Sequence, residues 1–343
     1  DADEYPCHRS VARHRCSWPI TGSTRRRPSE LRKSRWTKAE CRMARTTRNS
    51  VKRRRVATVE SALFNPDVLF LLASLLDARD LCQVSLTCKT LGGKQAGHNG
   101  LSLIEAAARR TFDCASDWET SCLPKYDDEG WIELYHHLLM LRSKLTFDQL
   151  VGDCLRYGFG GRDDDLFDRS TVQTFPGRLS FSSALCSNHV MRSGRHFAVF
   201  TKLNFLGTIG VVRPMQINVS DLGDGALRGF YEFSPTMRKF REYLRGKQTV
   251  RWKDSNVHCC AVDCDGRFFW YDWTYDQEAT RIEGFDSDSP FALLLDLDEG
   301  TLSMYQFGRS LGVLKNGLSG EYCWYANIFA EPITITRGLD PND

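Results

Sequence analysis

The residue types best suited to metal chemistry stand together at His258-Cys259-Cys260, with Cys264 four positions further along the chain. Imidazole nitrogens and thiolate sulfurs are the ligands that zinc prefers in proteins. The spacing is not that of a zinc knuckle, because no second Cys-x-x-Cys or His-x-His pair accompanies it. Successive side chains of a strand point to opposite faces, so Cys259 and Cys260 cannot easily bind one ion. The sequence therefore predicts core or edge cysteines here and no metal site.

Carboxylates are the second candidate chemistry. Asp163, Asp164 and Asp165, with Asp168 nearby, offer the oxygen ligands of a divalent cation. They lack the Asp-x-Asp-x-Asp-Gly order of a calcium loop, so a solvated acidic turn is predicted instead. The glycines at 158–161 have no following Lys-Ser/Thr, and the sequence contains no nucleophile elbow, His-Glu-x-x-His or kinase motif. We therefore predict no catalytic residue and no cofactor, and expect a chain that is not an enzyme.

The densest aromatic cluster lies at 268–273, with sequence FFWYDW. Strand alternation puts Phe268 and Trp270 on one face, and Phe269, Tyr271 and Trp273 on the other. One set is expected to fill a core. The other is either covered by a helical connector, which we favour, or exposed as a binding patch.

Charge divides the chain into a basic tail and an acidic body. Residues 1–56 carry 17 Lys and Arg against five Asp and Glu, whereas the remainder carries 29 against 38. The tail has few aliphatic residues, so it cannot bury enough apolar surface to offset the entropy of ordering, and disorder is predicted. Its run Lys52-Arg53-Arg54-Arg55 is typical of a solvated tail, a nuclear import signal or a nucleic-acid patch, and an organelle transit peptide also fits.

Localisation is predicted from what the sequence lacks. It contains no run of about 18 apolar residues, which a membrane span would need, and no signal-peptide core. The 13 cysteines are scattered and odd in number, and a chain of this length can build a core without disulfides. We therefore expect the cytoplasm or the nucleus, and no membrane partner.

Helices are predicted in the first part of the body. In the segment 60–92, Asn65 can cap a helix that has Pro66 at its first position. Apolar residues then recur at helical spacing, at Val68, Leu69, Leu72, Leu75 and Leu76. A second short helix is expected from Asp80, with apolar positions at Leu81, Val84 and Leu86. Such a pair buries little apolar surface alone and needs a partner or a neighbouring domain.

This segment resembles an F-box, the motif that docks substrate receptors on the Skp-type adaptor of cullin-RING ubiquitin ligases. The resemblance rests on FNPDV at 64–68, Leu72-Ala73, Leu76-Asp77, Asp80-Leu81, Val84-Ser85 and Cys88-Lys89. It implies an adaptor-binding set of Pro66, Leu69, Leu72, Leu76 and Leu81. The alternative is a plain helical hairpin that packs on the following domain.

A helical connector is expected over 98–150. It contains helices at Leu101–Phe112 and Trp131–Leu145, with a loop at Lys125–Gly130 between them. The Gly- and Asp-rich stretch 150–176 is then predicted to be a loop-like boundary.

The remainder, 175–338, is predicted to be an antiparallel β-sandwich, because short strands alternate with turn signals and no βαβ spacing appears. Asp265-Gly266 predicts a two-residue hairpin. Strands are expected at Ala292–Leu297, Thr301–Phe307 and Leu311–Leu314, separated by turns at 298–300 and 308–310. An unusually long insert, 213–254, carries Arg and Lys at 238–247. The predicted fold class is thus mainly β, with short helices and a disordered basic tail before the sandwich.

Three separated segments resemble a SPRY (B30.2-type) domain: SGRHFAVF at 193–200, IGV at 209–211, and LDLDEGTLSM with FGRSLGV at 295–304 and 307–313. SPRY domains bind proteins through loops at one end of a β-sandwich. The resemblance implies target-binding residues in three loops: Arg192, Arg195, Arg238, Arg241, Phe329 and Glu331.

Together the two resemblances imply a ubiquitin-ligase substrate receptor. Its partners would be a Skp-type adaptor, the cullin-RING ligase, and a target for which the basic insert favours an acidic surface. Two alternatives stay open: a SPRY interaction scaffold unrelated to ubiquitin, and a nucleic-acid-associated factor that uses residues 1–56.

Overall fold

The computed structural model describes residues 65, 68, 71, 75–93, 100–152, 154–159, 167–177, 182–201, 203, 207–217, 242–243, 245–253, 255–272, 280–329 and 331–338. The contacts divide the chain into two units, residues 1–61 and residues 62–343, and every described residue belongs to the second. The predicted tail 1–56 and the acidic group Asp163–Asp165 lie outside the described residues, so their predicted states stay predictions.

Five α-helices precede the strands in the described part of the chain: α3 (Ala78–Thr87), α4 (Lys89–Gly92), α5 (Leu103–Phe112), α6 (Asp117–Cys122) and α7 (Trp131–Arg142). The helices predicted at Leu101–Phe112 and Trp131–Leu145 are confirmed as α5 and α7. Helix α6 was not predicted, although Ser116 and Glu119 form a complete capping box at its start. Among the described helices, none combines the length and apolarity needed to cross a bilayer.

The helices share a small core of their own. On α7, Leu134, Leu138 and Leu141 recur four and three positions apart, so they lie on one face and are all buried. They pack with Leu81 of α3 and with buried residues of α5. Helix α3 begins where the Asp77 side chain accepts a hydrogen bond from the Asp80 amide at 2.8 Å.

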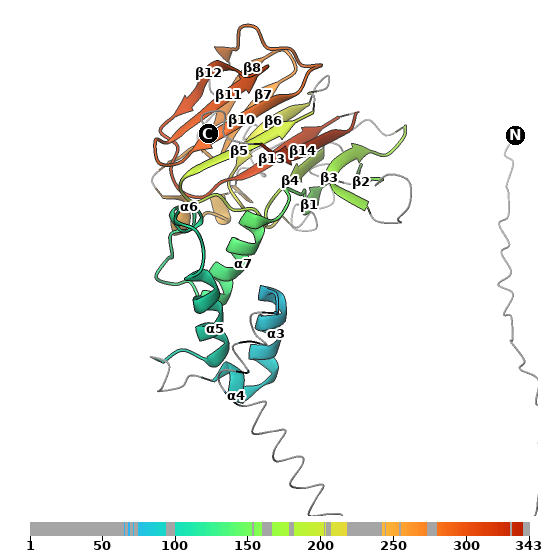
Figure 1. Cartoon of the computed structure of the whole chain (residues 1–343). Coiled ribbons are helices and arrows are strands. Elements are labelled where there is room, and N and C mark those ends of the chain that lie inside the picture. Colours follow the sequence, from blue (N-terminus) through green and yellow to red (C-terminus); the bar gives the residue numbers. More distant parts are fainter. Residues whose placement is uncertain are drawn as a thin grey trace, which may run out of the picture. The chain divides into compact units, whose positions relative to one another are not determined.

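The strands form two seven-stranded antiparallel sheets (Figure 1). Sheet I has the order β1-β4-β13-β6-β7-β8-β9, and sheet II the order β12-β11-β10-β5-β14-β3-β2. Their bounds are β1 (Gln149–Val151), β2 (Leu155–Phe159), β3 (Phe167–Thr174), β4 (Ser182–Leu185), β5 (Arg195–Phe200), β6 (Thr208–Val212), β7 (Cys259–Asp263), β8 (Arg267–Tyr271), β9 (Thr280–Arg281), β10 (Phe291–Asp296), β11 (Thr301–Gln306), β12 (Arg309–Asn316), β13 (Cys323–Ile328) and β14 (Ile333–Arg337). The predicted fold class, a mainly β antiparallel sandwich preceded by short helices, is confirmed for the described residues.

The main core lies between the inner faces of the two sheets. Phe200 of β5 stacks on Phe291 of β10, with ring centroids 5.7 Å apart, and meets Trp324 of β13 edge-on at 6.3 Å. Leu293 and Leu295 of β10 alternate inward beside them and are fully buried. Two facing sheets that contribute alternate residues produce this arrangement.

The predicted hairpins are confirmed, but two turns differ in detail: the β7–β8 turn has three residues, 264–266, where two were predicted, and the β11–β12 turn is shifted. Gly266 and Gly300 have φ values of 70° and 67°, as the short β7–β8 and β10–β11 turns require. The β11–β12 turn consists of Phe307 and Gly308, which both have positive φ, at 53° and 70°. Positive φ at both central residues is the mark of a type I′ turn, so β12 begins directly at Arg309, which was predicted to be part of the turn.

The sandwich also begins earlier than predicted. Strands β1, β2 and β3 occupy most of the stretch 150–176, which the composition had suggested was a boundary loop. In β3, Val172 and Thr174 are buried while Thr171 and Gln173 are only half-buried. β-Branched threonines are favourable in strands. Because threonine is polar, the alternation of buried and half-buried positions in β3 does not appear as an alternation of apolar and polar residues in the sequence.

The outer face of sheet I is also covered, but by the insert 213–254 rather than by the helical connector that the sequence favoured. Cys259, Tyr271 and Tyr325 pack there against Met215 and Trp252, which come from the two ends of the insert 213–254. Cys260 instead faces the main core, so the two neighbouring cysteines lie on opposite sides of sheet I, as predicted. The helical connector takes no part in this cluster.

Candidate functional site

The helical part exposes large apolar side chains. Val68, Leu71 and Leu75 stand at helical spacing and are exposed, Leu75 by 76%. Leu86 of α3 is also exposed by 76%. Exposed apolar side chains mark contact surfaces where they form a contiguous patch, whereas single exposed ones are common. We call Leu71, Leu75 and Leu86 the exposed leucine set.

The adaptor-binding residues predicted from the sequence lie differently. Leu81 is 1% exposed and Leu76 is half-buried, and both pack into the helical core. The Leu76 carbonyl accepts a hydrogen bond from the Tyr135 hydroxyl at 3.3 Å. Pro66, Leu69 and Leu72 lie outside the described residues. The structure therefore brings Leu76 and Leu81 into the same helical core, Leu81 within it and Leu76 half-buried at its edge.

Arg192, predicted to contact a target, is 1% exposed and sits between the helices and the sandwich. Its Nη1 lies 2.8 Å from each carboxylate oxygen of Glu129, which precedes α7. Its Nε lies 3.3 Å from Oε1 of Glu321, beside β13. Burial raises the pKa of the Glu321 carboxyl, and the Arg192 charge opposes that rise. The structure thus places Arg192 in an internal ion-pair network rather than on a loop open to a target.

A second arginine extends this network, and sequence reasoning did not find it. Arg251 lies in the short 3₁₀-helix η3 (Val250–Trp252). Its guanidinium contacts Glu133 of α7 at 3.0 Å and Asp128 at 3.1 Å. Both arginines also contact the Tyr126 ring, whose centroid is 5.0 Å from the Arg192 guanidinium carbon and 5.1 Å from that of Arg251. These contacts join the insert, the helices and the sandwich, and we call them the junction network.

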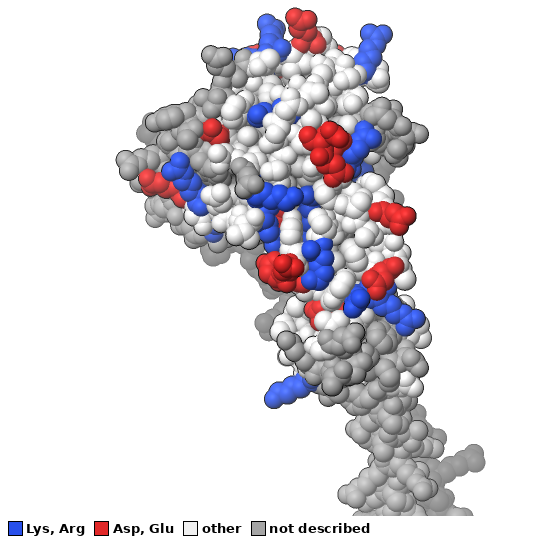
Figure 2. All heavy atoms as spheres, turned by 90° about the vertical axis from the view of Figure 1, so that its left-hand side faces the viewer, with Lys and Arg blue, Asp and Glu red and all other residues white. Residues whose placement is uncertain are grey.

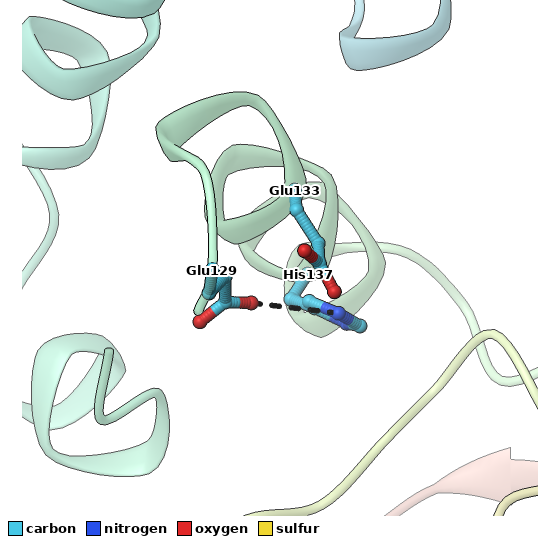
Figure 3. A group of neighbouring side chains, drawn as sticks. All are labelled: Glu129, Glu133 and His137. Carbon is cyan, nitrogen blue, oxygen red and sulfur yellow. Dashed lines mark ion pairs between the residues drawn. The ribbon is translucent and has the colours of Figure 1, made fainter. Parts of the chain in front are cut away.

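Part of the junction network has the residue types of a metal site. Glu129, Glu133 and His137 place one ligand atom each within 4.8 Å of one another, and Figure 3 shows them converging. The dashed contact there joins His137 Nε2 and Glu129 Oε1 at 3.9 Å. Burial and the charge of Arg192 lower the pKa of His137 to about 2, so the imidazole is neutral. Both carboxylates already face guanidinium groups that would repel a divalent cation, so the cluster belongs to the junction rather than to a metal centre.

The remaining predicted target-binding residues do not gather in one place. Arg195 begins β5 and lies 3.6 Å from Asp296 of β10. Phe329 and Glu331 follow the last residue of β13, whereas Met191 pairs with Tyr322 just before its first. The loop at 192–195 and the turn at 329–331 therefore lie at opposite ends of the sandwich. Arg238 and Arg241 lie outside the described residues.

Charged side chains of both signs are interspersed over the described surface seen in Figure 2. They mix most closely where the sandwich meets the helices. This face carries no broad basic area among its described residues, such as a nucleic-acid backbone would require.

Comparison with known proteins gives structural similarities only. No protein-family model matches the sequence, and no curated protein matches it. Similar solved structures include the SPRY domain of human HERC1, with TM-score 0.33 and 13% identity over 51% of this chain and 93% of that chain. The TRIM65 PSpry domain has a TM-score of 0.34 and 13% identity, over 59% of this chain and 94% of that chain. The carbohydrate binding module CBM66 from Bacillus subtilis has a TM-score of 0.31 and 11% identity, over 56% of this chain and 93% of that chain.

Proposed function

We propose that the chain is a protein-interaction module that catalyses nothing itself. Its helical part docks on a Skp-type adaptor of a cullin-RING ubiquitin ligase, and its sandwich holds a target protein for a partner enzyme to modify. The observation that carries the proposal is the exposed leucine set on helices that resemble an F-box. The compartment that suits this role is the cytoplasm or the nucleus.

The exposed leucine set has the energetics of a docking surface. Burying one leucine side chain contributes roughly 1.5–3 kcal/mol. Helices that lay leucines into a partner's groove are a common recognition mode. Because Leu81 is buried and Leu76 is half-buried against the helical core, we assign the docking contact to the exposed Leu75 and Leu86.

The junction network suits a receptor that must hold a target at a fixed distance from the ligase. Arg192 links Glu129 beside α7 to Glu321 beside β13, and Arg251 links η3 to α7. A target on the sandwich would be held rigidly relative to an adaptor on the helices. Within this proposal, Arg195, Phe329 and Glu331 remain candidate target contacts, and the basic residues Arg238 and Arg241 favour an acidic target.

Affinity purification with mass spectrometry tests the ligase role. Wild type is compared with Leu75→Asp, and with Val313→Asp as a matched control, since Val313 of β12 is also exposed, by 57%, and is remote in sequence from the helices. The adaptor and cullin should be recovered with wild type and with Val313→Asp, and lost with Leu75→Asp. Recovery of no adaptor with wild type would favour a scaffold unrelated to ubiquitin.

A second function is favoured by the charge of residues 1–56, which carry 17 basic residues. A tail of that charge can bind nucleic acid through its phosphates. Binding to duplex DNA that weakens steeply with salt, and vanishes when residues 1–56 are deleted, would support this role. Salt-independent or absent binding would remove it.

A further inference from the structure

A cavity of about 500 Å³ lies between the helices and the sandwich, away from the exposed leucine set. Trp118 of α6, Leu141 of α7, Phe197 of β5 and Trp324 of β13 supply its apolar walls. Ligand sites typically measure about 300–1,000 Å³, have largely apolar walls and favour boundaries between structural units. The size and position of this cavity fit that description, and its lining combines these apolar walls with several polar and charged side chains.

Arg337 stands at the rim of the cavity with most of its donors unused. It ends β14, and its Nη2 donates to the Ser143 carbonyl at 3.1 Å. A guanidinium offers five N–H donors, and among the described residues no carboxylate forms an ion pair with this one. Arg195, the other cation of the lining, already faces Asp296.

Two histidines line the same cavity without supplying charge. The rings of His189 and His196 meet edge-on with centroids 6.1 Å apart. His189 Nδ1 lies 3.3 Å from the Met140 carbonyl, and His196 Nε2 lies 2.9 Å from the Ser193 carbonyl. Burial lowers their pKa values to about 3 and about 4, so both are neutral near pH 7. Arg337 is therefore the cation of this lining that lacks an anionic partner.

Among the described residues, the lining contains one carboxylate, that of Asp298. Its Oδ1 accepts a hydrogen bond from the Gly194 amide at 2.9 Å, so it is held on the Gly194 side of the cavity. A ligand carboxylate must therefore bind on the Arg337 side. An apolar group attached to it would then occupy the space between Trp118 and Phe197.

We propose that this cavity binds a carboxylate attached to an apolar group, with Arg337 pairing with the carboxylate. Planar guanidinium and carboxylate groups can form two parallel hydrogen bonds, which gives both affinity and orientation. The carboxylate can come from an acidic target peptide, which deepens the proposed function by naming the chemistry that the sandwich reads, or from a free organic acid. The site requires no adaptor docking, so it stands or falls independently of the exposed leucine set.

Isothermal titration calorimetry of the full chain at pH 7.5 tests the proposal with two pairs of probes. Phenylacetate is compared with phenylacetamide, and an acetylated Asp-Phe amide with its Asn-Phe counterpart. At least one carboxylate probe should bind tenfold or more tightly than its neutral partner, and the pair that responds identifies the source. Arg337→Gln should weaken that binding at least tenfold, whereas Arg281→Gln, at an exposed arginine of β9, should leave it unchanged.

Two results would overturn the proposal. One is wild-type protein that binds neither carboxylate probe more tightly than its neutral partner. The other is Arg337→Gln protein with an unchanged thermal midpoint that retains wild-type affinity. Arg337→Lys separates charge from geometry, because it keeps the cation but loses the two-point contact, and it should fall between wild type and Arg337→Gln.

Discussion

At the scale of single residues, Arg192 shows how burial decides the role of a charged side chain. Its guanidinium is enclosed by Glu129 and Glu321, and removing it leaves two carboxylates without their counter-ion. Arg192→Ala should therefore lower the free energy of unfolding by about 3–5 kcal/mol. Urea denaturation measures this change.

The matched control is Arg281→Ala at an exposed arginine, which should change the free energy of unfolding by less than about 0.5 kcal/mol. Equal effects of the two substitutions would contradict the internal role of Arg192. The sequence could not reveal this role, because an arginine in an RSGR stretch looks the same whether a helix covers it or not.

The buried histidines predict acid sensitivity. His189 and His196 have folded pKa values of about 3 and about 4, below the ordinary value of 6.5. Between pH 6.5 and 4, these histidines therefore bind more protons in the unfolded chain than in the folded protein. The stability contribution is complete above pH 6.5 and is lost as the pH falls, at about 1.4 kcal/mol per pH unit for each histidine.

Urea denaturation at pH values from 7.5 to 4.5 measures this slope. His189→Gln should lower the slope of stability against pH by about 1.4 kcal/mol per pH unit, which corresponds to one proton. The raised pKa values of Asp148 and Glu321 affect the slope in the opposite direction, but they do so in both proteins and cancel in the comparison. An identical slope in the variant would show that His189 is not buried in its neutral form.

At the scale of elements, one glycine fixes how closely η3 approaches the sandwich. Gly320 has φ 81°, and a Cβ there would lie 2.4 Å from the Trp252 carbonyl oxygen. Gly320→Ala should therefore displace η3 and weaken the contacts of Arg251 with Glu133 and Asp128. The Trp252 amide donates a hydrogen bond to the Thr249 carbonyl, and the Glu321 amide donates one to the Arg251 carbonyl. Both amides should exchange their hydrogens faster in the variant, which hydrogen-exchange measurements can detect.

Gly317→Ala is the matched control, because Gly317 has a similar φ of 77° but nothing lies near its missing Cβ. It carries the same backbone strain without the overlap. If the two variants accelerate exchange equally, backbone strain rather than close packing controls η3.

The elements themselves were predictable where local chemistry is strong. The glycines at 266 and 300 predicted the β7–β8 and β10–β11 turns, and the apolar spacing within Trp131–Leu145 predicted α7. Strand β3 was missed because Thr and Gln occupy positions that face partly buried space, and β2 was missed because it runs into a Gly- and Asp-rich stretch. The cover of sheet I was also missed, because Met215 and Trp252 are far apart in the sequence and only the fold brings them together.

At the scale of the whole molecule, the candidate sites depend on contacts between distant segments. The sequence pointed to a helical part and a sandwich, but not to the junction that Arg192 and Arg251 form between them. Nor could the sequence show that the neighbouring residues Leu75 and Leu76 differ in exposure: Leu75 is exposed, whereas Leu76 is half-buried. That difference decides which substitution tests docking cleanly, since Leu76→Asp would disturb the helical core as well.

The central claim is that exposed leucines of the helical part bind a Skp-type adaptor. The most direct measurement is the dissociation constant between the purified chain and the purified adaptor, for wild type, Leu75→Asp, Leu86→Asp and Val313→Asp. Losing one buried leucine contact should weaken binding roughly 10-fold to 100-fold for Leu75→Asp and Leu86→Asp. Val313→Asp should bind as wild type does. Unchanged affinity in both leucine variants, or no measurable binding by wild type, would contradict the claim.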